Sequence, residues 1–416
     1  MNDLTHFNKR SPIFIIILGS LTAIGALSID MFLPGLPDIR HDFQTTTSNA
    51  QLTLSMFMIG LAFGNLFAGP ISDSTGRRKP LIIAMIIFTL ASLGIVFVHN
   101  IWLMVALRFL QGVTGGAAAV ISRAIASDMY SGNELTKFMA LLMLVNGIAP
   151  VVAPTIGGII LNYSVWRMVF VILTIFGFVM VIGSLLKVPE SLTVTNRESS
   201  SGLKTMFKNF KILLKTPRFV LPMLIQGMTF VILFTYISAS PFIIQKIYGM
   251  TAIQFSWMFA GIGITLIISS QLTGYLVDFI DSQKLMRGMT MIQIIGVILV
   301  TIVLLNHWNF WILAIGFIIL IAPVTGVATL GFTIAMDESS SGRGSSSSLL
   351  GLVQFLFGGV ASPLVGVKGE DNPIPYIIII IATAVILIIH RPMNLASKIK
   401  MPRLLCGNLG IFILIA

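Results

Sequence analysis

The sequence predicts an all-α integral membrane protein with twelve transmembrane helices. Hydrophobic residues make up 56% of the 416 residues and charged residues only 10%, whereas a water-facing surface would need about 25% charged residues. The apolar residues form runs of roughly 18 to 25 residues, long enough to cross a bilayer as helices. Lys and Arg are concentrated in alternate gaps between these runs, as the positive-inside rule predicts for a membrane protein.

The predicted spans follow one another along almost the whole chain. They lie at 11–33, 48–68, 80–98, 102–124, 137–161, 166–188, 218–240, 252–277, 287–306, 310–332, 346–367 and 374–390. No stretch resembles a cleaved signal peptide, because Lys9 and Arg10 precede a first apolar run that continues into further spans.

The basic residues predict the orientation in the cell membrane. Short loops rich in Lys and Arg stay cytoplasmic, and the gap after the second span carries Arg77, Arg78 and Lys79. Both termini are therefore expected in the cytoplasm. The net charge of +11 follows from this topology, so no nucleic-acid partner is expected. The gaps assigned to the outside hold only Arg40, Arg167, Lys246 and Lys368.

The longest polar gap divides the chain into two halves of six spans. We predict an N-terminal bundle at 1–188, a cytoplasmic linker at 189–217, a C-terminal bundle at 218–391 and a tail at 392–416, whose apolar end is too short to span. The halves also repeat, which predicts pseudo-symmetric bundles. Gly69, Asp73 and Lys79 recur 205 residues later as Gly274, Asp278 and Lys284.

The buried charges predict where a proton could cross the membrane. Asp30 is the only acidic residue inside an apolar run, and Arg108 is the only base clearly inside one, at a similar depth. Each charge alone would cost on the order of 2.5–3.5 kcal/mol at the bilayer centre, so each should face a partner or a wet cavity. We predict that Asp30 carries the proton, while Arg108 biases the pKa of Asp30 and fixes water or substrate. The alternative is that either side chain snorkels to the outer interface.

The gap between the second and third spans carries a motif, Gly69-x-x-x-Asp73-x-x-Gly76-Arg77-Arg78-Lys79. Its residues predict a tight turn in which Asp73 caps the following helix and the bases bind helix carboxyl ends. The alternative is a topology anchor only. The spacing resembles the signature loop of the major facilitator superfamily. This resemblance implies a fold of two six-helix bundles. It also implies a gating role for Gly69, Asp73, Gly76, Arg77, Arg78 and, in the repeat, Asp278.

Two further motifs extend the resemblance. Arg108-x-x-Gln111-Gly112 is similar to a motif of the superfamily, in which glycine allows close packing and Gln111 offers polar atoms to a cavity. The fifth span resembles the motif of drug–proton antiporters, with alanine at two positions where glycine is usual. The alternative for this span is a generic bent helix. Its motif residues are Pro150, Pro154, Gly157 and Gly158.

Stretches 28–37 and 234–248 narrow the resemblance to the Bcr/CflA subfamily of multidrug efflux proteins, over about residues 10–390. This resemblance implies proton-coupled export of small amphipathic antibiotics. Thr22 stands where some drug antiporters carry a second carboxylate, which argues against tight binding of cations.

Residue type alone predicts the substrate pocket, because methionine and aromatic walls adapt to varied apolar ligands. The alternative for each candidate is simple packing between helices. The candidates are Met31, Met56, Met58, Phe63, Gln111, Met143, Asn146, Gln226, Phe230, Tyr236 and Gln354.

These observations predict proton-coupled efflux, or antiport, of small amphipathic drugs by a monomer through alternating access. The alternative is a proton-coupled symporter that imports a small nutrient or metabolite, which would favour a more polar cavity. An enzyme is not expected, because no metal-ligand spacing or plausible Ser–His pair occurs. No metal or cofactor is expected, and no nucleotide-binding Gly-x-x-x-x-Gly-Lys-Ser/Thr loop is present. The expected partners are the drug, protons and the lipid bilayer.

Overall fold

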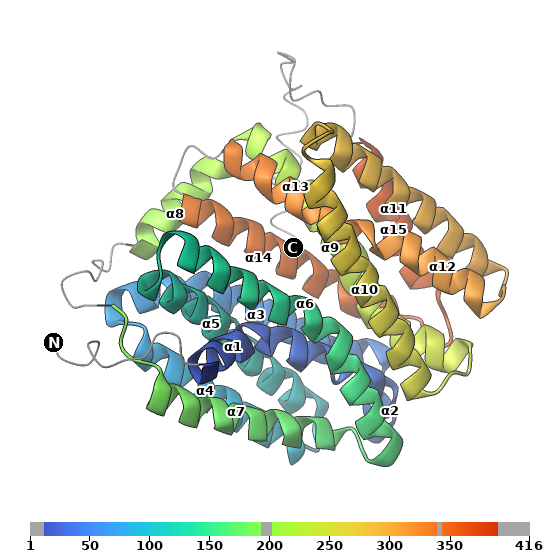
Figure 1. The fold of residues 1–416 in the computed structure, drawn as a ribbon. Helices are drawn as coiled ribbons and strands as arrows, with labels where there is room; N and C mark the ends of the chain where they lie inside the picture. The colour runs from blue at the N-terminus through green and yellow to red at the C-terminus, as the bar shows by residue number, and fades with distance from the viewer. Residues whose placement is uncertain (1–11, 193–201, 339–342, 390–416) are drawn as a thin grey trace.

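The computed structural model describes residues 12–192, 202–338 and 343–389, which are helical almost throughout and contain no β-strand (Figure 1). The first part comprises α1 (Pro12–Asp30), η1 (Leu33–Gly35), α2 (Leu36–Asp42), α3 (Thr47–Thr75), α4 (Arg78–Val96), α5 (Ile101–Met129), α6 (Gly132–Tyr163) and α7 (Arg167–Lys187). The second part comprises α8 (Gly202–Leu213), α9 (Pro217–Phe242), η3 (Ile243–Ile247), α10 (Ala252–Leu276), α11 (Ser282–Leu305), α12 (Phe310–Ile321), α13 (Pro323–Asp337), α14 (Arg343–Ala361), η4 (Ser362–Gly366) and α15 (Ile374–Ile389).

The predicted spans are confirmed as helices. In these ranges ten helical segments are long and apolar enough to cross a membrane, and two shorter apolar helices occupy the fifth and twelfth predicted positions. The predicted span 310–332 is interrupted between α12 and α13. Pro323 explains the interruption, because proline lacks an N–H group and its ring clashes with the carbonyl group four residues earlier. The predicted tail 392–416 lies outside the described residues.

The helices form two bundles that lie side by side (Figure 1). In the first bundle α5 packs against α3, α4 and α1, and in the second α9 packs against α13, α14 and α15. The bundles meet where α6 contacts α10 and where α3 contacts α14. The amphipathic helix α8, inside the predicted linker, packs against α14 and α3.

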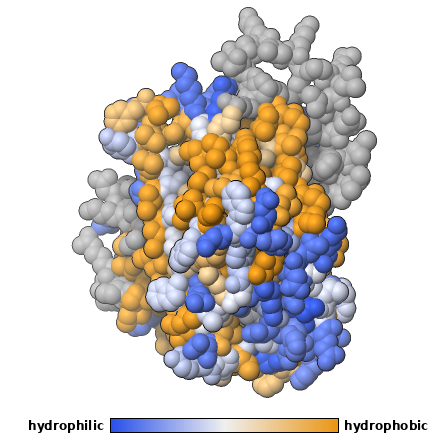
Figure 2. All heavy atoms as spheres, turned by 90° about the vertical axis from the view of Figure 1, so that its right-hand side faces the viewer, coloured by the Kyte–Doolittle hydropathy of each residue, from blue (hydrophilic) through white to orange (hydrophobic). Residues whose placement is uncertain are grey.

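The molecule has two ends along the helix axes, which we call the linker end and the α2 end. The linker end carries α8 and the turn between α3 and α4, and the α2 end carries α2, η3 and η4. On the side of the molecule nearest α2 and α12, hydrophilic residues lie across the middle and lower part of the surface, and hydrophobic residues flank them (Figure 2). The hydrophobic flanks are the part of this surface that suits contact with lipid.

Glycines allow α3 and α5 to pack closely. A Cβ atom added at Gly64 would meet the backbone of Val113, and one added at Gly112 would meet the backbone carbonyl of Phe57. Small residues at a crossing let two helix backbones approach each other within a membrane. The structure therefore confirms packing as the reason for the glycine in the Arg108-x-x-Gln111-Gly112 motif.

The helix N-caps extend the internal repeat beyond the motif found in the sequence. The hydroxyl of Thr46 caps α3, and the hydroxyl of Thr251, 205 residues later, caps α10. The amide oxygens of Asn100 and Asn309 each accept a hydrogen bond from the backbone N–H of a tryptophan two residues on. Equivalent helices of the two halves therefore begin with the same local structure, because a cap side chain bonds an N–H group that the helix itself leaves unpaired.

The glycine packing predicts different effects for two similar substitutions. Gly112→Ala should lower the free energy of unfolding by about 1–3 kcal/mol, because the new methyl group overpacks the α3–α5 contact. Gly261→Ala adds its methyl group to open space on α10 and should be neutral or stabilising by up to about 1 kcal/mol through helix propensity. Thermal unfolding of the purified protein in detergent measures both. Equal effects would show that the contact is not tight.

Candidate functional site

Arg108 lies in the middle of the first bundle and is fully buried. Its Nη1 donates hydrogen bonds to the carbonyl oxygen of Ser28 on α1, at 3.1 Å, and to Oε1 of Gln111, at 2.6 Å. Its Nε donates to the carbonyl oxygen of Thr53 on α3, at 3.4 Å. Arg108 therefore ties α5 to α1 and α3 within the bundle.

Three aromatic rings complete the surroundings of the Arg108 guanidinium. Its central carbon lies 4.5 Å from the ring centroid of Phe32, 4.3 Å from that of Phe57 and 5.6 Å from that of Phe170. A guanidinium this close to a ring face gains cation–π attraction, which is strongest where water is excluded. The charge is thus stabilised by the protein and does not reach bulk solvent.

Asp30 is the last residue of α1 and is 5% exposed. It lies between Ser28 and Phe32, both of which contact Arg108, so the two charges have similar depths, as predicted. Within the described residues its carboxylate makes no hydrogen bond or ion pair. The side chain is buried in this conformation and does not extend into bulk solvent, as snorkelling would require. The role of Asp30 as proton carrier stays a prediction.

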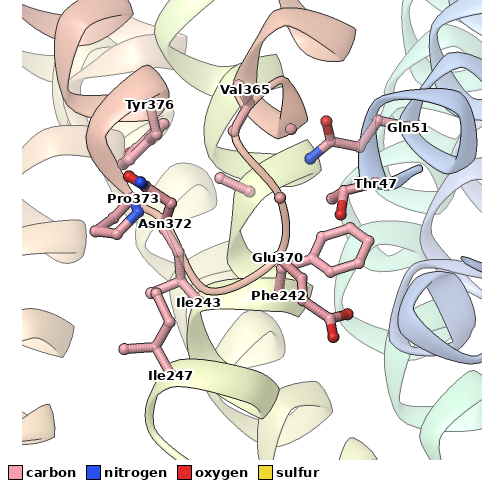
Figure 3. Close-up of a pocket in the computed structure, with 13 residues that line it drawn as sticks. Thr47, Gln51, Phe242, Ile243, Ile247, Val365, Glu370, Asn372, Pro373 and Tyr376 are labelled. Carbon is pink, nitrogen blue, oxygen red and sulfur yellow. The ribbon is translucent and has the colours of Figure 1, made fainter.

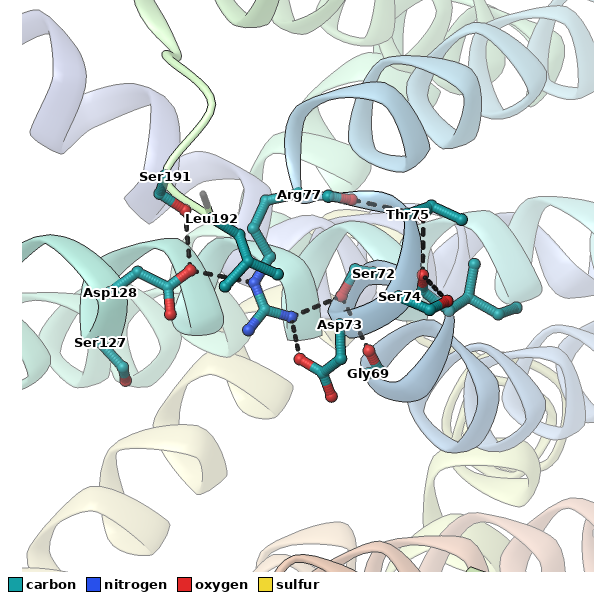
Figure 4. A network of polar contacts seen from close by, with 12 residues as sticks. Gly69, Ser72, Asp73, Ser74, Thr75, Arg77, Ser127, Asp128, Ser191 and Leu192 are labelled. Carbon is teal, nitrogen blue, oxygen red and sulfur yellow. Dashed lines mark hydrogen bonds and ion pairs between the residues drawn. The ribbon is translucent and has the colours of Figure 1, made fainter. Parts of the chain in front are cut away.

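A polar network at the linker end is centred on Arg77 (Figure 4). Arg77 forms ion pairs with Asp73 and, at 3.0 Å, with Asp128 of α5, and it donates a hydrogen bond to the hydroxyl of Ser72. Burial by itself would lower the pKa of Arg77, but the hydrogen bond with Asp128 and the charge of Asp73 outweigh it and raise this pKa overall. Arg77 therefore stays charged and links α3 to α5.

Glu190 completes this network from the segment after α7. Its Oε1 accepts a hydrogen bond from the backbone N–H of Arg77 at 2.8 Å, and its Oε2 accepts one from that of Arg78 at 3.3 Å. Glu190 thus binds the unpaired N–H groups at the start of α4, where negative charge is favourable. This role is not apparent from the sequence, because Glu190 lies more than one hundred residues from Arg77 along the chain.

Two features of the predicted turn are wrong. Gly69 to Thr75 form the last two turns of α3, so only Gly76 and Arg77 separate α3 from α4. Gly76 has a φ of 96°, which favours glycine. Asp73 does not cap α4, because it pairs with Arg77 from within α3. The predicted contact of a base with a helix carboxyl end is confirmed for Arg78, whose Nη2 donates to the carbonyl oxygen of Leu185 near the end of α7.

The described residues of the second half do not form a network of this kind. Asp278, the counterpart of Asp73, lies after the end of α10, is exposed, and has no ion pair or hydrogen bond within the described part of the chain. The N-cap of α11 is Asp281, which accepts hydrogen bonds from the backbone N–H groups of Gln283 and Lys284. The repeat in the sequence is therefore not a repeat of the ionic contacts.

The two halves are joined by polar contacts at the α2 end. Four side-chain hydrogen bonds between described residues cross from one half to the other, and all four lie at this end. The bond between Arg40 and Glu370 is also an ion pair, in which Nη1 lies 3.1 Å from Oε1. The donor–acceptor pairs are Arg40–Glu370, Ser48–Pro363, Gln51–Ser238 and Gln245–Pro34.

A small pocket lies at this junction (Figure 3). Thr47 and Gln51 of α3 line it from one half, and Glu370 and Tyr376 line it from the other. Its volume of about 10 Å³ is close to the room that one water molecule needs. The hydroxyl groups of Thr47 and Tyr376 are buried without a partner, so a single water there would have polar groups to bind. This pocket therefore has room for one water molecule and nothing larger.

The predicted substrate residues are not gathered at the Arg77 network or at the pocket of the α2 end. Their role in binding substrate stays a prediction, and Gln111 already serves Arg108 and donates to Ser92. Gln354 is partly exposed, and the side chains of Met143 and Asn146 lie outside the described residues. The buried candidates are Met31, Met58, Gln111, Gln226 and Tyr236.

The motif of the fifth span lies on α6. Pro150 and Pro154 are inside this helix. A Cβ atom added at Gly157 would meet the backbone of Met31, and one added at Gly158 would meet Ser256 of α10. Gly158 therefore lies at the contact between the two halves, where α6 and α10 pack together.

The fold, with membrane-length helices in two related bundles that polar contacts join at one end, defines a class of protein, a multi-pass membrane transporter. A family model described as Major Facilitator Superfamily matches residues 18–363. The chain belongs to this family, and it is a transporter and not an enzyme.

Relatives and solved structures support this assignment. The chain is 39% identical to an uncharacterised major facilitator transporter, YdgK of Bacillus subtilis, over 89% of this chain and 92% of the relative. It is 30% identical to a bicyclomycin resistance protein homolog of Haemophilus influenzae, over 91% of this chain and 95% of the relative. Its fold resembles the crystal structure of a bacterial homolog of the lysosomal transporter Spinster in an inward-facing, unoccupied conformation, with a TM-score of 0.72 at 15% identity over 92% and 96% of the two chains.

The network around Arg77 predicts that equivalent positions of the two halves differ. Asp73→Asn should lower the free energy of unfolding by about 1 kcal/mol, because it removes one of two carboxylates from a largely buried guanidinium, whereas exposed ion pairs contribute less. Asp278→Asn should change it by less than about 0.5 kcal/mol. Denaturant unfolding in detergent compares them, and an equal loss in both variants would contradict the ionic role of Asp73.

Proposed function

We propose that this protein exports small amphipathic drugs from the cytoplasm in exchange for protons, as a member of the Bcr/CflA subfamily. The observation that carries the proposal is that the four side-chain hydrogen bonds between described residues of the two halves all lie at the α2 end, where α1 ends at the buried acid Asp30. A relative named for bicyclomycin resistance supports the substrate class. A 26% identical relative from Vibrio parahaemolyticus, covering 92% of this chain and 96% of its own, is named multidrug resistance protein MdtL.

The proposed mechanism is alternating access by a monomer in the cytoplasmic membrane. The bundles 1–188 and 218–391 rock against each other, joined by the linker 189–217, and the linker end and both termini face the cytoplasm. The contacts at the α2 end then represent the state that is closed toward the outside. Related halves that move about a central site are the usual design of such transporters.

In this scheme Asp30 takes up a proton when the α2 end opens and releases it when the linker end opens. Arg108 is a positioning residue that fixes α1 on both sides of Asp30 through Ser28 and Phe32. Drug and proton bind alternately, with Gln226, Tyr236 and Gln354 among the residues proposed to face the drug. The Arg77 network, Asp278 and the proline–glycine segment of α6 govern the change between states.

The proton gradient supplies enough free energy for this exchange. A proton moving inward across about 100 mV yields roughly 2.3 kcal/mol, and each unit of pH difference adds about 1.4 kcal/mol. At about 1.4 kcal/mol per tenfold ratio, one proton per neutral drug could sustain a drug gradient of a few hundredfold. ATP is not required for a gradient of this size.

The first test of the proposal concerns Asp30. In energised inverted membrane vesicles, an added drug should drive protons out of the vesicle lumen through the native protein, and Asp30→Asn should abolish this flux because amide cannot carry the proton. Asp371→Asn, an exposed acid at the same end, should leave it unchanged. Undiminished flux in Asp30→Asn would exclude Asp30 as the carrier, and movement of substrate and protons in the same direction would identify a symporter.

The second test concerns the movement of the halves. Cysteines at Ser48 and Pro363, in a Cys406→Ser background, would lie on opposite sides of the closed α2 end, where the Ser48 hydroxyl is 2.6 Å from the Pro363 carbonyl oxygen. A short, reducible thiol cross-linker should stop transport, and reduction should restore it, because the α2 end must open in each cycle. Single-cysteine variants treated in the same way are the controls. Normal transport by the cross-linked protein would contradict alternating access at this end.

A further inference from the structure

A groove lies on the first bundle over α5, between α3 and α4. Its volume is about 500 Å³, within the range of about 300–1,000 Å³ typical of small-molecule sites. Phe67, Ile83 and Ile121 line it from the three helices, and the only charged residue in its lining is Lys79. The small residues Ala68 and Ala117 also line it.

The length of the groove matches one leaflet of a bilayer. On α3 it extends from Phe63 to Thr75, and twelve residues of α-helix rise about 18 Å. Half of a hydrocarbon core of about 30 Å is about 15 Å. The groove therefore begins near the middle of the membrane and ends at the linker-end surface, where Lys79 lies exposed.

The positive charge of Lys79 has no partner among the described residues. Of the three consecutive bases, Arg77 pairs with Asp73 and Asp128, and Arg78 binds the carbonyl oxygen of Leu185. Within the described ranges Lys79 has no ion pair or side-chain hydrogen bond. A free ammonium group thus stands at the water end of an apolar channel as deep as a leaflet.

We propose that this groove binds one phospholipid with an anionic headgroup, with one acyl chain along α5 and the headgroup phosphate paired with Lys79. An apolar slot one leaflet deep fits the chain, and the cation at its end fits the headgroup. The lipid would bridge α3 and α4 beside the Arg77 network. This inference does not depend on which substrate the protein transports.

Native mass spectrometry of the purified full-length protein in detergent tests the proposal. Phosphatidylglycerol should remain bound in preference to phosphatidylcholine with the same chains. Lys79→Gln should weaken phosphatidylglycerol binding about fivefold, because a basic residue near the surface contributes about 1 kcal/mol toward an anionic lipid and 1.4 kcal/mol corresponds to tenfold. Lys187→Gln removes an exposed charge from the end of α7 and should change binding by less than twofold.

A second pair of variants tests the position of the chain. Ala117→Phe fills the groove and should abolish retention of phosphatidylglycerol, whereas Ala382→Phe adds the same bulk to an exposed position on α15 and should not. Inorganic phosphate should not displace the lipid, because the chain supplies most of the binding. Equal losses in Lys79→Gln and Lys187→Gln, or displacement by phosphate, would overturn the proposal. So would full retention by Ala117→Phe, and if that variant does not fold, the lysine pair decides alone.

Discussion

The fully buried guanidinium of Arg108 is the constraint on which the first bundle depends. A charge without partners inside a membrane costs on the order of 2.5–3.5 kcal/mol even by the lowest scales, so the surrounding helices must supply its hydrogen bonds. They do so for Nη1 and Nε with the carbonyl oxygens of Ser28 and Thr53 and the side chain of Gln111. Three aromatic rings surround the guanidinium, whose Nη2 has no hydrogen-bond partner among the described residues. These contacts require α1, α3 and α5 to keep one fixed arrangement, which the glycines at the α3–α5 crossing make possible.

The end of α1 connects this fixed interior to the other half of the molecule. Ser28 and Phe32 are held by Arg108, and four residues after Asp30 the carbonyl oxygen of Pro34 accepts a hydrogen bond from Gln245 of the second half. Asp30 thus lies between the Arg108 contacts within the first bundle and a contact between the halves, which breaks if the α2 end opens as proposed. A change of charge at this position acts on the segment that joins the two, which is the coupling that the proposed antiport needs.

The sequence predicted what depends on local composition, and it failed where distant residues decide. Apolar runs gave the twelve spans, and a census of charges singled out Asp30 and Arg108. It misplaced the end of α3, because Gly69 and Pro70 read as turn residues although the helix continues through them. It could not find Glu190 as the partner of the α4 N-terminus or Glu370 as the partner of Arg40, since such contacts exist only once the helices have packed.

The polar contacts at the α2 end have a strength that suits the proton-driven cycle proposed above. Four hydrogen bonds join the halves there, and at a net of about 0.5–1.5 kcal/mol each they contribute roughly 2–6 kcal/mol. One proton entering down the potential and pH differences considered above yields about 3.7 kcal/mol. A much stronger junction would hold the protein in one state, and a much weaker one would let drug and protons leak. The junction has only these few polar contacts, with room for one water between them. The free energy needed to open it is therefore similar to the free energy that one proton supplies.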